Sequence, residues 1–309
     1  GLIKIDYNVS DTADITIEAN PDDLTRQKIK ELSKTPVNRL SIGVQSFFED
    51  DLKSMNRAHN ANEAKECLEI ATQYFDNITI DLIYGIPTMY NTRWKDNLQI
   101  AFGFEVNHIS SYALTVEPKS ALDSFIKKGK YPPIDEDKAL QHFDILVEET
   151  EKNGFIQYEI SNFGKPDYFS KHNTSYWLGK PYFGIGPSAH SYDGLHRSWN
   201  VSNNVKYLKS IQLDTIPQET EILSLKDRFN EIIMTGLRTI WGVSLDEIEF
   251  KFGTDYKDHL LLNSKEFINK QLLEIVSSKG SIKDTTKTLK ITNKVKFLVD
   301  GIASEMFMI

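Results

Sequence analysis

The chain has 309 residues, of which 40% are hydrophobic and 26% charged, and its formal net charge is −8 at pH 7. This composition is typical of a globular protein with one large or two ordinary domains, and no apolar run approaches the ~18 residues of a membrane-spanning helix. The acidic balance argues against a nucleic-acid partner, because such binding depends on clustered Lys and Arg. We therefore expect no nucleic-acid binding and no stable membrane anchor.

The sequence contains one cysteine, Cys67, which cannot form an internal disulfide. This usage favours a reducing compartment. The opening residues GLIKIDYNVSD also lack the basic region and apolar run of a signal peptide. We expect a cytoplasmic protein.

The first 120 residues alternate between strand-like and helix-like patterns. Strand patterns cover 15–21, 39–47, 77–87 and 108–118, and helical patterns cover 22–34, 61–75 and 91–104, the last with Asn91 or Thr92 as its cap. This alternation predicts a parallel sheet with helices outside it. Because function in such sheets lies just past the strand C-termini, the polar residues there are expected to converge on one rim: Glu18, Gln45, Asp81 and Tyr112.

The rest of the chain has a different character. A loop at 131–137 leads into a long helix at 137–154, and residues 155–200 are rich in Tyr, Phe, Gly, Asn and Pro with little periodicity. From about residue 204 the pattern is helical, and it ends in the outline of a winged-helix unit. We place one domain at 1–200 and a second at 201–309.

The polar residues at the strand ends suggest a ligand. Carboxylates such as Glu18 and Asp81 accept hydrogen bonds from ribose hydroxyls, and Gln45 lies between them in chain order. Arg57 follows Gln45 by twelve residues and suits a carboxylate. The implied ligand combines a ribose with a carboxylate. The alternative is that Arg57 only forms a surface ion pair with one of the acids at positions 49–51.

Seven ordered segments between about residues 15 and 200 carry a family resemblance: TIEANPDDL, NRLSIGVQSFFEDDLKSMNRAH, ITIDLIYGIPT, ISSYALTVEPKS, QYEISNFGKP, HNTSYW and GIGPSAHSY. Together they resemble the radical S-adenosylmethionine proteins related to oxygen-independent coproporphyrinogen III oxidase, and more closely the HemW branch, proposed haem chaperones. The resemblance implies an α/β fold: a partial (β/α)6 barrel with four strands retained here, followed by an α+β region with a winged-helix-like unit.

The resemblance also implies roles for matching residues. Glu18 and Asp81 look like the ribose-binding carboxylates, and Gln45 and Arg57 like the contacts to the methionine end of S-adenosylmethionine. Ala113 matches a backbone position beside the adenine. No catalytic residue is assigned.

One part of the family pattern is missing. The family binds a [4Fe–4S] cluster with a Cys-x3-Cys-x2-Cys loop and holds the amino group of S-adenosylmethionine with a glycine-rich segment, and the chain has neither. We expect a fragment that holds no cluster and performs no radical chemistry, the cluster belonging to the intact protein only. The uncovered edge of the first strand then predicts self-association or a disordered N-terminal segment.

The segment HNTSYW, residues 172–177, is similar to the haem-associated form of the HemW branch. His172 is the candidate iron ligand, Asn173 its orienting partner, and Tyr176 and Trp177 candidate walls for the porphyrin. His172 could instead bond a backbone carbonyl in a loop over the barrel mouth. His190 competes for the ligand role or faces the cofactor rim. The remaining histidines are expected to be surface or structural: His59, His108, His142, His196 and His259.

Three functions remain open at this stage. The first is a haem chaperone that binds haem or a porphyrin and S-adenosylmethionine and passes haem to a receiving protein. The second is the oxygen-independent coproporphyrinogen III oxidase, a dehydrogenase that decarboxylates two propionates. The third is a scaffold with an inactive barrel. The HNTSYW segment favours the first.

Overall fold

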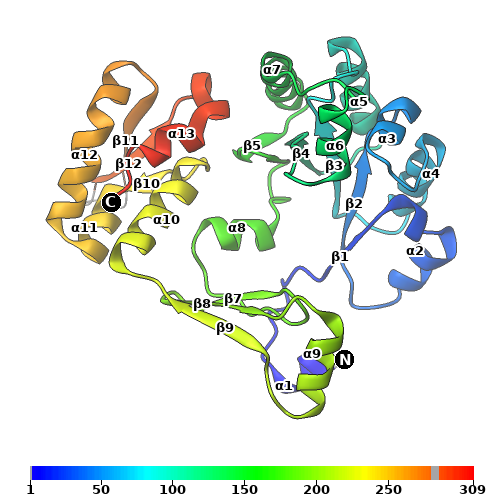
Figure 1. Cartoon of the computed structure of the whole chain (residues 1–309), viewed down its shortest axis with the longest axis horizontal. Coiled ribbons are helices and arrows are strands. Elements are labelled where there is room, and N and C mark those ends of the chain that lie inside the picture. The colour runs from blue at the N-terminus through cyan, green and yellow to red at the C-terminus, as the bar shows by residue number, and fades with distance from the viewer. Residues whose placement is uncertain (1, 280–284) are drawn as a thin grey trace. The chain divides into compact units, whose positions relative to one another are not determined.

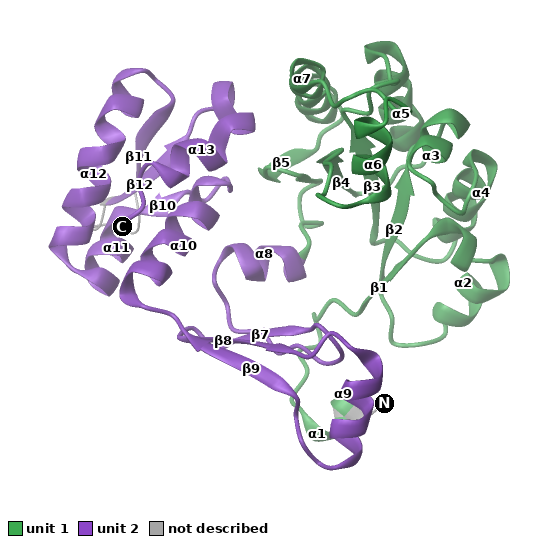
Figure 2. Cartoon of the chain, in the orientation of Figure 1, with its two compact units in different colours: residues 1–170 green, residues 171–309 purple. Residues whose placement is uncertain are grey.

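The computed structural model describes residues 2–279 and 285–309 and divides into two compact units, Gly1–Ser170 and Lys171–Ile309 (Figure 2). The expected boundary after residue 200 differs from this division. Residues near 190–200 pair in a sheet with residues 218–222, so 171–200 group with the C-terminal unit. Across the described ranges, no helix combines the length and apolar character needed to span a membrane.

The first unit is built on a six-stranded sheet in the order β1-β2-β3-β4-β6-β5 (Figure 1). The first four strands pair in parallel, which confirms the sequence prediction, whereas β6 and β5 are antiparallel. The β5–β6 hairpin was not predicted, because its segment lacks a clear period. The strands are β1 (Thr16–Ala19), β2 (Arg39–Gln45), β3 (Ile78–Tyr84), β4 (His108–Ala113), β5 (Ile156–Glu159) and β6 (Asn162–Gly164).

Helices connect the parallel strands as the alternation predicted. Helix α4 begins with a capping box formed by Asn60 and Glu63. The expected cap of α5 was wrong, because Tyr90 occupies the N-cap without a side-chain bond and Asn91 is the first helical residue. The helical segments of this unit are α1 (Leu2–Asp6), η1 (Pro21–Asp23), α2 (Arg26–Leu32), α3 (Glu49–Ser54), α4 (Ala61–Ala71), α5 (Asn91–Gly103), α6 (Ala121–Lys127) and α7 (Glu136–Lys152).

Side chains alternate between the two faces of the parallel strands. One set is apolar and buried: Leu40, Ile42 and Val44 on β2, and Ile78, Ile80, Leu82 and Tyr84 on β3. Tyr84 contacts Trp94 of α5 and Phe143 of α7, with ring centroids 5.9 and 6.3 Å apart, so this face packs against the helices. The other set is largely polar and includes Arg39, Thr79, Asp81 and His108. The inner face of the sheet is therefore polar.

The loop after β2 is fixed by two buried polar side chains. The Asn97 Oδ1 atom accepts from the Phe47 backbone N–H at 2.7 Å, and the Ser46 hydroxyl donates to Asp51 Oδ2 at 2.8 Å. Asn97 and Asp51 are fully buried, and Arg93 pairs with the second Asp51 oxygen at 3.1 Å. Helices α3 and α5 thus hold the C-terminal end of β2 in place.

The second unit starts with a helix and a small antiparallel sheet in the order β7-β8-β9. Asn200, at the end of β8, is buried and donates to the Gly186 carbonyl oxygen at 2.8 Å. The elements are α8 (Lys171–Trp177), β7 (His190–Tyr192), β8 (His196–Asn200), α9 (Asn204–Gln212) and β9 (Gln218–Ile222).

The C-terminal part has the helix–strand–helix–helix–strand–strand order of a winged-helix unit, as expected. The helical pattern expected there is wrong for Leu273–Lys279, which form strand β11 and pair with β12. Phe229, Ile233 and Leu237 form a fully buried stripe along α10. A Cβ on Gly242, whose φ is +72°, would lie 2.6 Å from the Leu289 carbonyl oxygen, so this tight turn requires glycine. The elements are α10 (Leu225–Leu237), β10 (Val243–Ser244), α11 (Leu245–Phe252), α12 (Thr254–Asn269), β11 (Leu273–Lys279), β12 (Thr285–Ile291), η2 (Asn293–Leu298) and α13 (Val299–Ser304).

Replacing Asn97 with alanine is expected to destabilise the first unit. The buried Phe47 N–H would lose its acceptor, which costs about 1–3 kcal/mol in the free energy of unfolding. Urea unfolding followed by circular dichroism measures this change. Asn62→Ala, at an exposed position of α4, is the matched control. Equal midpoints for the two variants would show that Asn97 does not anchor the loop.

Candidate functional site

Glu18 and Asp81 share the inner face of the sheet. Glu18 of β1 pairs in register with Ser41 of β2, and Asp81 of β3 pairs with Ser110 of β4. The two carboxylates lie close enough for the charge of Glu18 to raise the pKa of Asp81. The sequence prediction that these strand residues converge is in accord with this electrostatic coupling.

Burial raises the pKa of the Asp81 carboxyl to about 6. The neighbouring Ser110 hydroxyl opposes this rise in pKa, while the charge of Glu18 adds to it. The positive charges of Arg39 and Arg57 also lower the pKa. Asp81 thus lies among two cations and a second carboxylate, and a hydroxyl-bearing ligand could replace water around it.

Arg57 reaches this set through the end of α3. Asn56 adopts a φ of +53°, the Asn56 N–H donates to Lys53 O at 3.0 Å, and the Arg57 N–H donates to Leu52 O at 3.0 Å. These bonds form a Schellman motif, which turns the chain out of the helix. The alternative of a pair with the acids at 49–51 is not what the described residues show: those acids pair with Lys53 and Arg93, and Arg57 is exposed without an ion pair.

Gln45 ends β2 in a strained conformation. Its φ is +66°, and the pairing of β2 with β3 shifts register between Ile42 and Gln45. Non-glycine residues rarely adopt such a φ, and bulges of this kind re-aim side chains. A Cβ on Gly43 would lie 2.9 Å from Gln45 Nε2 and 3.1 Å from Asn20 Oδ1. The absence of a side chain at Gly43 therefore leaves room for the side-chain amides of Gln45 and Asn20 next to it on the inner face.

Ala113 completes the rim of the parallel strands. It is the last residue of β4, where it pairs with Tyr84 at the end of β3. Its neighbour Tyr112 follows Ser110 by two residues on β4 and therefore lies on the same inner face as Asp81. Burial and then the charge of Asp81 raise the pKa of its phenol. The backbone of Ala113 is thus at the same end of the sheet as Gln45.

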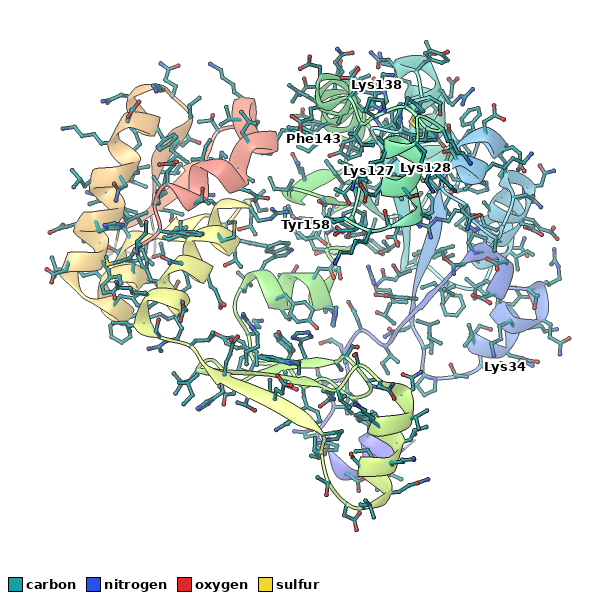
Figure 3. All side chains as sticks on the ribbon, viewed as in Figure 1. Lys34, Lys127, Lys128, Lys138, Phe143 and Tyr158 are labelled. Atoms are coloured by element: carbon teal, nitrogen blue, oxygen red, sulfur yellow. The ribbon has the colours of Figure 1, made fainter. Side chains whose placement is uncertain are left out.

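A buried polar network lies beside the carboxylates, at the start of the strands. Arg39 donates to the Thr79 hydroxyl, which bonds His108 Nδ1 at 3.1 Å. His108 Nε2 bonds at 2.7 Å the hydroxyl of Tyr158, a residue of β5 that is labelled in Figure 3. Burial, with the charge of Arg39, lowers the pKa of His108 to about 3, so the imidazole is neutral. Arg39 and Tyr158 were not among the predicted site residues, although the alternation in RLSIGVQ places Arg39 on the polar side.

The residues present do not fit an iron–sulfur cluster. Cys67 is 3% exposed within α4, and burial raises its thiol pKa to about 12, which disfavours the thiolate that ligates iron. It is the single cysteine of the sequence. In the described ranges, no group of three or more His, Cys, Asp or Glu side chains could hold a metal ion.

The HNTSYW segment forms helix α8, so the alternative that placed His172 in a loop is wrong. The exposed His172 ring contacts Tyr176 edge-on with centroids 4.6 Å apart, and Tyr176 contacts Tyr182 in the same manner at 4.5 Å. Asn173, next to His172, is half-buried. Trp177 differs in role, because Arg238, the C-cap residue of α10, stacks over its ring at 5.2 Å and so connects α8 to the end of α10.

His190 occupies a different setting from His172. It is the first residue of β7 and is exposed, and its ring centroid lies 6.1 Å from that of Trp199 on the paired strand. Among the described residues, neither histidine belongs to a group of three or more His, Cys, Asp or Glu side chains that could hold a metal ion. His172 contacts the ring of Tyr176, which lines a cavity of the second unit.

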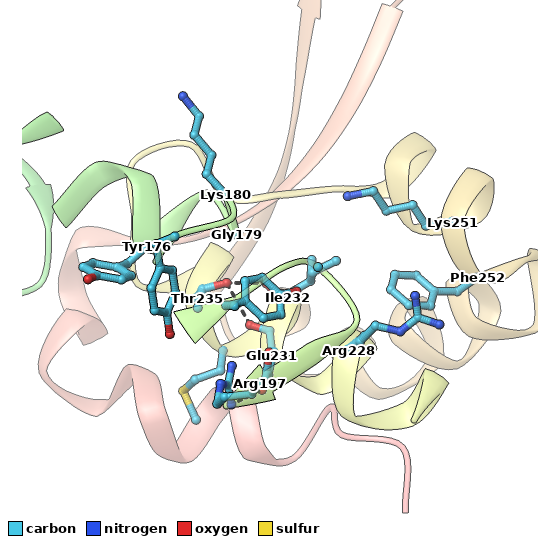
Figure 4. Close-up of a pocket in the computed structure, with 14 residues that line it drawn as sticks. Tyr176, Gly179, Lys180, Arg197, Arg228, Glu231, Ile232, Thr235, Lys251 and Phe252 are labelled. Carbon is cyan, nitrogen blue, oxygen red and sulfur yellow. Dashed lines mark hydrogen bonds and ion pairs between the residues drawn. The ribbon is translucent and has the colours of Figure 1, made fainter. Parts of the chain in front are cut away.

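A cavity of about 520 Å³ lies within the second unit, between α8, the β7–β8 hairpin and helices α10 and α11 (Figure 4). Its volume is that of small-molecule sites. Its lining joins aromatic and charged side chains: Tyr176, Tyr182, Tyr192, Phe252, Lys180, Arg197, Arg228, Lys251 and Glu231, with smaller residues between them. No sequence pattern could have grouped these residues, because they come from four separated segments.

Two family models match the chain. The model of the Radical SAM superfamily matches residues 2–99, and that of the HemN C-terminal domain matches residues 223–279. In structure, the chain resembles coproporphyrinogen III oxidase (HemN) from Escherichia coli, with a TM-score of 0.79 and 18% identity over 99% of this chain and 72% of the other. That likeness establishes the fold, a radical-SAM barrel with an appended C-terminal region.

The relatives found by sequence identify the family more narrowly than the likeness in structure does. The chain is 32% identical to the heme chaperone HemW of Bacillus subtilis (strain 168), over 94% of this chain and 74% of that protein. It is 34% identical to the heme chaperone HemW of Lactococcus lactis subsp. lactis (strain IL1403), over 94% and 76%. A mitochondrial radical S-adenosyl methionine domain-containing protein 1 of Dictyostelium discoideum is 34% identical, over 94% and 70%. With its sheet, its polar inner face and these relatives, the chain belongs to the HemW family of radical S-adenosylmethionine proteins.

Proposed function

We propose that the chain binds haem at α8, binds S-adenosylmethionine on the inner face of the first unit, and passes haem to a receiving protein. The observation that carries the haem proposal is the contact between the exposed His172 ring and Tyr176, which lines a ligand-sized cavity. The relatives named heme chaperone HemW support the same function. A lone, buried cysteine suits a reducing compartment such as the cytoplasm.

The inner face offers recognition groups for a nucleoside with a carboxylate. Bound S-adenosylmethionine would supply a ribose, an adenine and the methionine carboxylate. Glu18 and Asp81 would accept from the ribose hydroxyls, and Arg57, which has no ion pair among the described residues, would bind the carboxylate. Gln45 and the Ala113 backbone would contact the methionine end and the adenine. Because Cys67 cannot hold a cluster, we assign no radical step to these residues.

Haem binding at α8 would use a neutral imidazole and flat aromatic surfaces. His172 would ligate the iron, with Asn173 as its neighbour, and Tyr176 would pack on the porphyrin. Trp177 would act indirectly, because its stacking with Arg238 positions the helix. His190 lies against Trp199 and is the rival ligand.

The oxidase alternative has support from the fold alone. The match to HemN is 18% identical, and proteins that share a fold often differ in function. The named chaperones are more similar in sequence, at 32% and 34% identity. We therefore propose haem transfer and not decarboxylation of coproporphyrinogen III.

Replacing His172 with alanine is expected to weaken haem binding at least about tenfold, since changes even to residues that support a metal ligand often cost that much. The measurement is a titration with haemin followed by the shift of the Soret band. His190→Ala is the matched variant and should retain the wild-type titration. The reverse pattern would transfer the ligand role to His190, and two unchanged titrations would remove both residues from it.

The affinity for S-adenosylmethionine is expected to rise as the pH increases through the Asp81 pKa of about 6. Below that pKa the carboxyl is protonated and accepts poorly from ribose hydroxyls, and above it the carboxylate accepts well. From about pH 5 to about pH 7, the ionised fraction and the affinity should grow about tenfold. Isothermal titration calorimetry at each pH measures the affinity.

Asp81→Asn should bind more weakly and lose this pH dependence. Asp96→Asn, at an exposed position of α5, removes one carboxylate elsewhere and should behave as the wild type. A pH profile that persists in Asp81→Asn would assign the titration to another group.

A further inference from the structure

The cavity of the second unit carries an unusual charge distribution for a site with aromatic walls. Four cationic side chains line it, Lys180, Arg197, Arg228 and Lys251, against one acidic side chain, Glu231. Figure 4 shows Tyr176 on one side and Arg228 with Phe252 on the other. A flat, apolar ligand with negative groups at its edge would match both features.

The acidic residue does not cancel this charge. Glu231 pairs with Arg197 at 2.7 Å, and Arg197 also stacks over the Tyr192 ring at 5.6 Å. One cation and one anion are thereby neutralised together and held against an aromatic wall. The other cations of the lining are Lys180, Arg228 and Lys251, of which Lys251 pairs with Glu247, a residue that is not part of the lining.

Arg228 is the strongest anion-binding candidate. Across the described residues it has no ion pair, and its Nε atom is buried without a hydrogen-bond acceptor. A buried donor left without an acceptor costs free energy that a ligand oxygen would recover. The guanidinium fork also suits a carboxylate bidentately.

Lys251 supplies a second anchor from the adjacent helix. Its present partner is Glu247, one turn earlier in α11, at 2.6 Å, and both side chains are about half exposed. Such surface pairs are worth little, so the ammonium can exchange that carboxylate for one on a ligand. The Tyr192 hydroxyl lies in the field of Glu231, Arg197, Arg228 and Lys251, which places these charges around one spot.

We propose that this cavity recognises the two propionate groups of a porphyrin, with Arg228 and Lys251 as the carboxylate partners and Tyr176 and Phe252 as aromatic walls. The inference deepens the proposed haem function and rests on it. In this proposal the second unit binds the propionate edge of the porphyrin. His172, whose ring contacts Tyr176 in the cavity wall, would ligate the iron. Selection for free propionates would then be independent of iron ligation.

The test compares protoporphyrin IX with its dimethyl ester, by porphyrin fluorescence, on the 309-residue chain. Both probes lack iron, so neither depends on His172. The wild type is expected to bind the dicarboxylate about tenfold more tightly than the ester, the scale of one hydrogen bond to a charged group. Arg228→Gln and Lys251→Gln should each reduce this preference, and Arg228→Lys should retain part of it.

Lys265→Gln is the matched control, because Lys265 is exposed on α12 and has no ion pair within the described residues. It should keep the full preference. The inference would be wrong if Arg228→Gln kept the full preference for the dicarboxylate, or if the wild type bound the two probes equally. In either case, a haemin titration that is weakened by His172→Ala would still support the proposed haem function. Absence of binding for haemin and both probes would overturn the two proposals together.

Discussion

Alternation of side chains along four parallel strands is the constraint on which the first unit depends. The apolar set of β2 and β3 is buried against α5 and α7, as the contacts of Tyr84 show. Because side chains alternate, the intervening residues all face inward, and the charges of Glu18 and Arg39 shift the pKa of Asp81. Packing on one face therefore produces a concentrated set of charges on the other, and that set is what a polar ligand can use.

The backbone adopts an unusual conformation where this set of charges reaches the end of β2. Gln45 adopts a left-handed φ of +66°, and the absence of a side chain at Gly43 leaves space in which the amides of Gln45 and Asn20 approach each other. Such strain persists only when the surroundings fix it, and Asn97 and Asp51 provide that fixation from neighbouring helices. The strained strand end and its anchors are consistent with a preorganised site, because natural proteins concentrate such exceptions at functional positions.

The parts that sequence could predict are those with a local signal. The four parallel strands and their connecting helices follow from periodicity, and so does the inner-face position of Asp81. Asp81 lies in the middle of β3, however, and not at the strand end that the sequence predicted. The β5–β6 hairpin and the helical state of residues 171–177 lacked such a signal, and tertiary contacts such as Trp177 with Arg238 now account for the place of α8. Arg228 and Lys251 could not be predicted, because a cavity formed by distant segments leaves no pattern along the chain.

The most direct test of the account is a crystal structure of the chain with S-adenosylmethionine. We expect ribose hydroxyls within about 3 Å of carboxylate oxygens of both Glu18 and Asp81, with the methionine carboxylate at Arg57. A ligand bound at another surface, or one whose ribose contacts neither carboxylate, would contradict it. That result would show that the polar inner face serves the stability of the sheet and not the binding of a nucleoside.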